Sequence, residues 1–456
     1  MIKIVSSSNR AAVDRLLATT RVRDRATEER AAEIVARVRS GGDAALKRFA
    51  RELDALDGPI EVPRGAWESH ARALPPAVRA AISRAAVHIR RVARQQAPKG
   101  WRLQVAPGLS VEQRVIPLTR VGCYVPAGRY PLPSSLLMTA IPARAAGVPE
   151  VIVACPRPDA AVFAAAIEAG VDRLFRVGGA HAISAMAYGT RTVPRVDKIV
   201  GPGNRWVSAA KALVSADCGI DFYAGPTEIL IVAATGPARW IAADLIAQAE
   251  HDPDARAVLV TPNRRLAGQV AREVEQQLRP GRGLRPSPSI TSTSPLKPSP
   301  SIAATSLSRH GGIIVCRSIG EAIDLANQAA PEHLVVGTEA LARRVWNAGA
   351  VFVGGWTAQV AGDYAIGSNH VLPTAGAARF RGGLNAADFV KLVSVQRLTR
   401  AGLGRIAKTV TALARAEGLE GHARSIEVRE GKPKGLPPRR RERSQRKPRK
   451  SRRSRN

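Results

Sequence analysis

The sequence predicts an α/β fold in which two doubly wound parallel sheets are accompanied by small helical segments at both ends of the chain. From about residue 150 onward, short apolar strands alternate with Ala-rich helices, and Gly-containing turns separate them. The strands carry no polar face, which is typical of a mostly parallel sheet that helices cover on both sides. At 456 residues, the chain is also long enough for two or more domains.

The first 120 residues are expected to be mainly helical. Residues 26–39 and 76–95 carry apolar side chains three and four positions apart, the spacing of amphipathic helices. Further along, apolar runs predict strands at residues 151–154, 173–177, 229–232, 257–260 and 312–315. Predicted helices lie between them, at residues 160–169, 182–188, 205–214 and 240–250. This alternation of strand and helix predicts the doubly wound topology.

Two segments are not expected to pack in the core. Residues 280–308 include a run rich in Pro and Ser, which predicts a mobile surface insertion. Residues 430–456 hold 13 Lys and Arg against two acidic residues, which predicts a disordered basic tail.

Composition limits the class of protein. No run approaches the length of a membrane span, and the N-terminus lacks the apolar region of a signal peptide. The four cysteines lie far apart, which favours reduced thiols in a cytoplasmic protein. The net charge of +32 allows nonspecific, salt-dependent binding to nucleic acid, but a solvated tail and an Arg-biased composition also account for it. Specific nucleic-acid binding is not expected, because no aromatic residue follows Phe389.

Five of the eight histidines lie in segments that could carry chemistry. Gln248 and His251 are three apart at the end of a predicted helix, so they share a face on which an oxygen and an imidazole could bind one metal ion. A merely polar helix end is the simpler interpretation. Glu332 and His333 stand at the start of a predicted strand, where neighbouring side chains point to opposite faces. Residues 362–374 form a predicted Gly-rich loop of a kind that often carries function.

A nicotinamide cofactor is not indicated by the usual fingerprint. Neither Gly178-Gly179 nor Gly201-Pro202-Gly203 satisfies G-x-G-x-x-G. Both segments follow apolar strands and open helices, so helix N-termini could still face an anionic ligand. Spacing alone therefore supports only a phosphate site or an incomplete, atypical dinucleotide site.

Taken in order, six motifs resemble those of the histidinol dehydrogenase family, over about residues 121–428. They are VGCYVPAG (121–128), VDKIVGPGN (196–204), AGPTE (224–228), QAEH (248–251), PEHL (331–334) and GDYAIGSNHVLPT (362–374). The resemblance implies Rossmann-like domains, one zinc ion per subunit, and oxidation of L-histidinol to L-histidine through L-histidinaldehyde with two NAD.

The resemblance also implies roles for individual residues. The implied zinc ligands are Gln248, His251, Asp363 and His422, and the implied acid/base pair is Glu332 and His333. Tyr124, His181 and Asn204 would contact the dinucleotide. The substrate would meet Thr227, Gln248, His251, His333, Asp363, Glu417 and His422. In this scheme His333 takes the hydroxyl proton of the alcohol, and Glu332 activates the water that adds to the aldehyde.

Two positions depart from the family pattern. His181 stands where the best-known members have a dinucleotide-contacting Gln, and Gln359 stands where they have Glu. The second change removes a negative charge near the cationic end of the substrate. An NAD-dependent oxidation of another alcohol, such as a sulfonated diol, is therefore the alternative activity.

The resemblance further implies a homodimer in which the C-terminal segment completes the site of the partner. The expected organisation is an N-terminal arm (1–19), a first α/β domain (20–123 with 229–378), a second α/β domain (124–228), a C-terminal dimerisation segment (379–429) and the tail (430–456).

Overall fold

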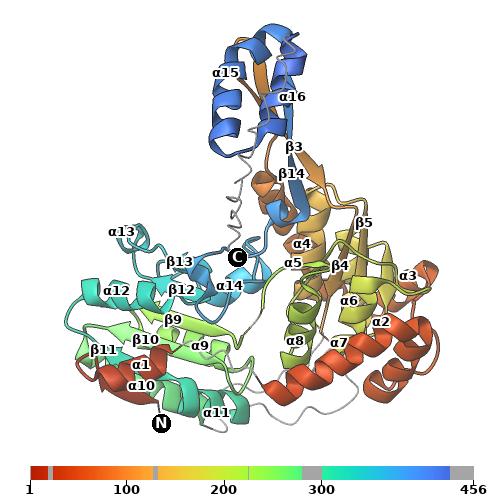
Figure 1. Ribbon diagram of the computed structural model, residues 1–456. Coiled ribbons are helices and arrows are strands. Elements are labelled where there is room, and N and C mark those ends of the chain that lie inside the picture. The colour runs from red at the N-terminus through yellow and green to blue at the C-terminus, as the bar shows by residue number, and fades with distance from the viewer. Residues whose placement is uncertain (1, 19–23, 127–131, 224, 280–299, 432–456) are drawn as a thin grey trace, which may run out of the picture. The chain divides into compact units, whose positions relative to one another are not determined.

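The computed structural model describes residues 2–18, 24–126, 132–223, 225–279 and 300–431 (Figure 1). Most of the Pro/Ser-rich insertion and nearly all of the basic tail thus lie outside the described residues. The chain divides into two compact units. The first comprises Met1–Pro98 and Ile116–Lys391, and the second comprises Lys99–Val115 and Leu392–Asn456. Each unit is described by itself.

The first unit contains a parallel six-stranded sheet, sheet A, with the strand order β1-β11-β10-β9-β12-β13. Residues along a central strand alternate between two cores: Ile229 and Ile231 belong to one, and Leu230 and Val232 to the other. Helices α9, α10 and α11 supply the first core, and α1 and α12 supply the second. The strands are β1 (Lys3–Ser6), β9 (Glu228–Val232), β10 (Arg256–Thr261), β11 (Gly312–Val315), β12 (His333–Val336) and β13 (Ala350–Val353). The helices are α1 (Arg10–Leu17), α9 (Ala238–Ala249), α10 (Arg264–Leu278), α11 (Pro300–His310), α12 (Ile319–Ala329), α13 (Glu339–Ala342) and α14 (Gln359–Tyr364).

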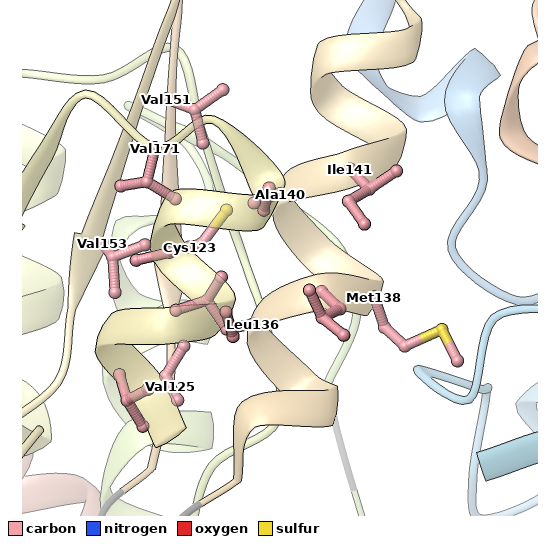
Figure 2. Close-up of a cluster of buried hydrophobic side chains, with 14 of the residues drawn as sticks. Cys123, Val125, Leu136, Met138, Ala140, Ile141, Val151, Val153 and Val171 are labelled. Atoms are coloured by element: carbon pink, nitrogen blue, oxygen red, sulfur yellow. The ribbon is translucent and has the colours of Figure 1, made fainter. Parts of the chain in front are cut away.

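The same unit contains a second parallel sheet, sheet B, with the order β6-β5-β4-β7-β8. Figure 2 shows part of one of its cores, in which Cys123 and Val153 from the strands face Leu136 and Ala140 of a helix. The strands are β4 (Arg120–Tyr124), β5 (Glu150–Ala154), β6 (Arg173–Phe175), β7 (Lys198–Val200) and β8 (Gly219–Ile220). The helices around them are α2 (Arg25–Asp54), α3 (Trp67–Arg72), α4 (Pro76–Gln96), α5 (Pro133–Ala145), α6 (Ala160–Ala169), α7 (Gly179–Tyr188) and α8 (Arg205–Val214). Two parallel sheets, each covered on both faces, confirm the predicted fold class.

The helices of residues 25–96 pack on sheet B, which corrects the expected grouping of 20–123 with 229–378. Helix α2 packs against α7 and α8, and α4 packs against α5 and α6. The physical reason is the apolar stripe of α2, whose Ile34, Val38 and Phe49 share a core with the buried side chains of α7. The expected N-terminal arm, in turn, supplies β1, an edge strand of sheet A.

Two local predictions are also corrected. Residues 300–308 belong to the packed helix α11, where Ala303 and Leu307 are buried four positions apart and Ser306 donates a hydrogen bond to the Ala255 carbonyl. The prediction of a mobile insertion is wrong for these residues, because this apolar spacing lets the helix join the core of sheet A. The predicted loop 362–374 begins inside helix α14.

The second unit combines a three-stranded sheet, in the order β14-β3-β2, with two helices. Its strands are β2 (Trp101–Ala106), β3 (Leu109–Pro117) and β14 (Val390–Leu398), and its helices are α15 (Arg400–Ala416) and α16 (Glu420–Glu430). Gly108, with φ +79°, forms the turn between β2 and β3, and a Cβ there would lie 2.3 Å from the Thr399 Oγ1. The expected C-terminal segment 379–429 is therefore divided: its first part lies in the first unit, and residues 99–115 join its remainder.

Three short 3-10 helices complete the described structure, at Arg64–Ala66, Ala377–Arg379 and Ala386–Phe389. Within the described ranges, no helix is both long and apolar enough to cross a membrane. All four cysteines are buried and free.

Candidate active site

The candidate catalytic residues gather at the amino edge of sheet A. Strands β9 and β12 are parallel neighbours in which His333 pairs with Ile229. The residues that precede and begin these strands, Thr227, Glu228 and Glu332, therefore lie beside one another. Helix α9 ends at the same edge, since Gln248 in its last turn donates a hydrogen bond of 2.6 Å to the Thr227 Oγ1.

Glu332 is held by two donors in a buried position. The Thr227 hydroxyl donates to Glu332 Oε2 at 2.6 Å, and the Glu228 amide donates to the same oxygen at 2.9 Å. Burial raises the pKa of Glu332 to about 8, and the charge of Asp363 acts in the same direction against the two hydrogen bonds. A carboxyl group that titrates in this range can exchange a proton during a reaction near neutral pH.

His333 presents one free ring nitrogen. Its Nδ1 lies 3.0 Å from the Glu228 carbonyl oxygen, which can only accept, so Nδ1 carries the proton. Its Nε2 is buried without a hydrogen-bond partner and lies 3.8 Å from Asp363 Oδ1. Burial lowers the pKa of His333. The neutral ring with an unprotonated Nε2 is the form that a general base requires.

Asp363 is positioned by helix α14 and by the segment that follows it. The Gln359 side-chain amide donates to Asp363 Oδ2 at 2.8 Å, and the His370 Nδ1 donates to the Asp363 carbonyl at 2.9 Å. Gly362 lets α14 pack closely on β13, because a Cβ at this position would lie 2.6 Å from the Phe352 ring. Asp363 therefore faces His333 on a fixed backbone.

The candidate cofactor residues lie at the carboxyl edge of sheet B. Strands β5 and β6 extend the sheet on one side of β4, whereas β7 and β8 extend it on the other, so the connection changes direction between β4 and β7. Such a switch point is where open α/β sheets bind their ligands. Tyr124 ends β4, and the exposed Asn204 caps helix α8 directly after β7.

His181 does not stand free beside these two residues. It is buried on α7, and its Nε2 lies 2.8 Å from Asp54 Oδ2, which also accepts a bond of 2.8 Å from the Gly178 amide. The Tyr124 hydroxyl accepts a bond of 3.1 Å from the Gly179 amide. Protein acceptors thus already occupy the first amides of α7, while the His181 Nδ1 has no partner.

Comparisons with known proteins give one consistent result. The sequence profile of the histidinol dehydrogenase family matches residues 17–430. The chain is 44% identical to a histidinol dehydrogenase of Methylococcus capsulatus over 430 residues, which cover 91% of this chain and 95% of that protein. It is 45% identical to one of Thermus thermophilus over 412 residues, which cover 89% and 95%. The chain belongs to the histidinol dehydrogenase family.

A solved structure supports the same conclusion. The crystal structure of a histidinol dehydrogenase from Elizabethkingia anophelis matches with a TM-score of 0.86 and 29% identity, over 94% of this chain and 98% of that one. Family membership confirms the resemblance inferred from the six motifs, and with it the predicted enzyme class, an oxidoreductase of the dehydrogenase type.

The predicted zinc ligands of this histidinol dehydrogenase family member are only partly brought together. Asp363 lies beside His333, Gln248 donates to Thr227, and His251 follows Gln248 on the exposed side of the α9 terminus. Glu417 and His422 are exposed in the second unit, at the junction of α15 and α16. Among the described residues, no group of three or more His, Cys, Asp or Glu side chains lies close enough to hold a metal ion.

Two contributors to the site were not singled out from the sequence. Glu228 supplies both its amide to Glu332 and its carbonyl to His333, and its place in the AGPTE motif could have indicated it. Asp54 holds His181 from 127 residues away, and nothing local in the sequence marks it.

Proposed function

We propose that this protein oxidises L-histidinol to L-histidine through L-histidinaldehyde, with two NAD and a zinc ion. The observation that carries the proposal is the buried pair of Glu332 and His333, in which a carboxyl with a raised pKa stands beside an imidazole with an unprotonated, unpartnered Nε2. An acid and a base with different tasks are what a two-step oxidation of an alcohol to an acid requires.

In the first step, the His333 Nε2 accepts the hydroxyl proton of the alcohol, and NAD, when bound, would supply the hydride acceptor. The aldehyde and NADH are the products. In the second step, Glu332 takes a proton from the water that adds to the aldehyde, which leaves the hydrate anion, and a second NAD would accept the hydride of that anion. Thr227 and the Glu228 amide hold the Glu332 carboxyl in place throughout.

The residues fit a zinc ion of mixed nitrogen and oxygen ligation. Gln248 uses its Nε2 to bond Thr227, which leaves its buried Oε1 without a partner and available as a ligand. His251 and Asp363 would add an imidazole and a carboxylate, and His422 a second imidazole. A bound zinc ion supplies a positive charge that orients the alcohol and lowers the cost of removing its proton.

The cofactor is proposed to bind at the switch point of sheet B, against Tyr124 and Asn204. Both residues stand at the carboxyl edge, where the N-termini of α7 and α8 favour an anion such as a pyrophosphate. The first amides of both helices already bond protein acceptors, Asp54 and Tyr124 at α7 and the Asn204 side chain at α8, so we expect the helix dipoles rather than these amides to favour the phosphates.

The proposal is tested with the purified zinc-loaded protein, L-histidinol and NAD. Two NADH per L-histidinol consumed are expected, with L-histidine as the product. One NADH per substrate, with release of the aldehyde, would contradict the assignment of Glu332. No turnover of L-histidinol together with turnover of another alcohol would favour the alternative activity.

That alternative is favoured by one observation. Gln359 is fully buried beside Asp363, its amide donates to that carboxylate, and its Oε1 has no partner. A neutral side chain here attracts a cationic substrate group less than a carboxylate does. A comparison of L-histidinol with a sulfonated diol, at equal zinc occupancy, separates the two activities.

A homodimer is proposed as the active assembly. In the second unit, alternate residues of β2, Trp101, Leu103 and Val105, are 48%, 55% and 53% exposed and lie on one face of the strand. Leu392 on β14 is 56% exposed as well. An apolar sheet face of this kind is typical of an interface between protein chains, and Glu417 and His422 of one copy would complete the site of the other. Light scattering of the purified protein should give the mass of two chains.

A further inference from the structure

A buried ion pair lies directly under the switch point of sheet B. Lys211 on α8 and Asp221 after β8 contact each other, with side chains only 3% and 1% exposed. Burial of two charges is costly unless every polar atom is well bonded. This pair gains two further hydrogen bonds from one loop residue: the Gly201 amide donates to Asp221 Oδ2 at 2.8 Å, and Lys211 donates to the Gly201 carbonyl at 3.0 Å.

Gly201 itself is in tight contact with the end of β4. Its φ is +118°, and a Cβ at this position would lie 2.1 Å from the Tyr124 carbonyl oxygen. Asn204 follows three residues later and caps α8 through its own side chain. The ion pair therefore fixes Gly201, which closely approaches the backbone of Tyr124 and begins the loop leading to Asn204.

The other end of β7, the strand that leads into Gly201, offers a contrast. Lys198, at the start of β7, also bonds an acidic residue, Asp388, but the two side chains are 14% and 21% exposed. That ion pair lies at the opposite edge of the sheet from Tyr124 and Asn204. If the buried pair served only to anchor β7, it would not need to bond both the amide and the carbonyl of Gly201. Those two bonds fix the loop that follows the strand.

We propose that Lys211 and Asp221 are positioning residues for the nicotinamide cofactor. By holding Gly201 against Tyr124, they keep the loop of residues 201–204 in the conformation that receives the dinucleotide at the switch point. This inference rests on the proposed function, and it extends that function to two side chains that do not themselves contact the cofactor.

The double variant Lys211→Met with Asp221→Asn tests the inference. This double variant removes both charges together, because a single substitution leaves an uncompensated charge in the core and destabilises the fold. Lys198→Met is the matched control: it removes a lysine from an ion pair at the other end of the sheet. The measurements are NADH affinity by fluorescence titration of the zinc-loaded protein, amide hydrogen exchange at Gly201, and the KM values of both substrates.

The double variant should bind NADH about tenfold more weakly, since it loses a charged hydrogen bond to the loop. The Gly201 amide should exchange faster, and the KM of L-histidinol should stay within about twofold of the unmodified value. Lys198→Met should keep the unmodified NADH affinity. Unchanged NADH affinity in the double variant, or an equal loss in Lys198→Met, would overturn the inference.

The unmodified protein separates this inference from the proposed function. A failure of the unmodified protein to bind NADH contradicts the proposed cofactor and the positioning role together. Normal NADH binding that does not respond to the double variant contradicts the positioning role alone.

Discussion

Sheets A and B use opposite edges for their candidate ligand groups. In sheet A, Glu332 and His333 stand where β12 begins, and Gln248 and His251 stand where α9 ends. In sheet B, Tyr124 stands where β4 ends, and Asn204 stands where α8 begins. The amino edge of a doubly wound sheet is lined by helix C-termini, which favour a cation, whereas the carboxyl edge is lined by helix N-termini, which favour an anion. A metal at the first edge and a dinucleotide at the second follow the same electrostatic rule.

The two edges also differ in how many of their buried polar atoms have hydrogen-bond partners. At the edge of sheet A, Gln248 Oε1, Gln359 Oε1 and His333 Nε2 are buried without partners. At the edge of sheet B, the helix amides are bonded by Asp54, Tyr124 and Asn204, and the buried His181 Nδ1 lacks a partner. Unpaired buried polar atoms are costly, so the edge of sheet A, where three of them gather, is the one better suited to receive a ligand in direct contact. Substitutions there should have the larger effects.

The largest effect is expected for His333→Asn. The substitution removes the unprotonated Nε2 and should lower kcat by about 10³-fold, because a positioned general base contributes this order of rate. Steady-state NADH formation measures the loss. NADH affinity should be unchanged because the cofactor groups lie on sheet B, so a parallel loss of NADH binding would refute the separation of the two edges.

Glu332→Gln should have the next largest effect, and only on the second oxidation. The amide cannot accept a proton from water, so the oxidation of L-histidinaldehyde should slow by about 10²-fold. The first hydride transfer should proceed at a nearly normal rate, because His333 is retained. Single-turnover experiments that start from the alcohol and from the aldehyde measure the two steps separately, and equal slowing of both would contradict the division of labour.

The residues changed in these two predictions could be identified from the sequence alone. The strands at 151–154 and 312–315 were predictable because each is apolar throughout, and Glu332 and His333 because they are adjacent in one motif. Other features depend on contacts between distant segments. The apolar spacing of α2 predicts a helix but not which sheet the helix covers, and the bond between Asp54 and His181 leaves no local signal in the chain. The pKa of Glu332 depends on burial that only the folded edge creates.

A smaller effect is expected for Gln359→Leu. The substitution leaves Asp363 Oδ2 without its donor at 2.8 Å and should weaken zinc binding about tenfold, the usual cost of losing a hydrogen-bond partner of a metal ligand. Competition with a chelator measures the affinity. Gln359→Glu is the control that keeps the volume and adds a charge. Wild-type zinc affinity in Gln359→Leu would show that Asp363 needs no orientation by Gln359.

The smallest effect is expected for His181→Gln at the edge of sheet B. The glutamine amide can replace the imidazole Nε2 as donor to Asp54, so the carboxylate that also binds the Gly178 amide stays in place. NAD affinity should therefore change by less than about threefold. The corresponding free energy is no larger than that of one weak hydrogen bond between neutral groups. His181→Ala, which leaves Asp54 with the Gly178 amide and without the side-chain donor, should cost more than His181→Gln. An increase in NAD affinity of tenfold or more in His181→Gln would mean that residue 181 contacts the cofactor directly, and the two edges would then be less different than their hydrogen bonds indicate.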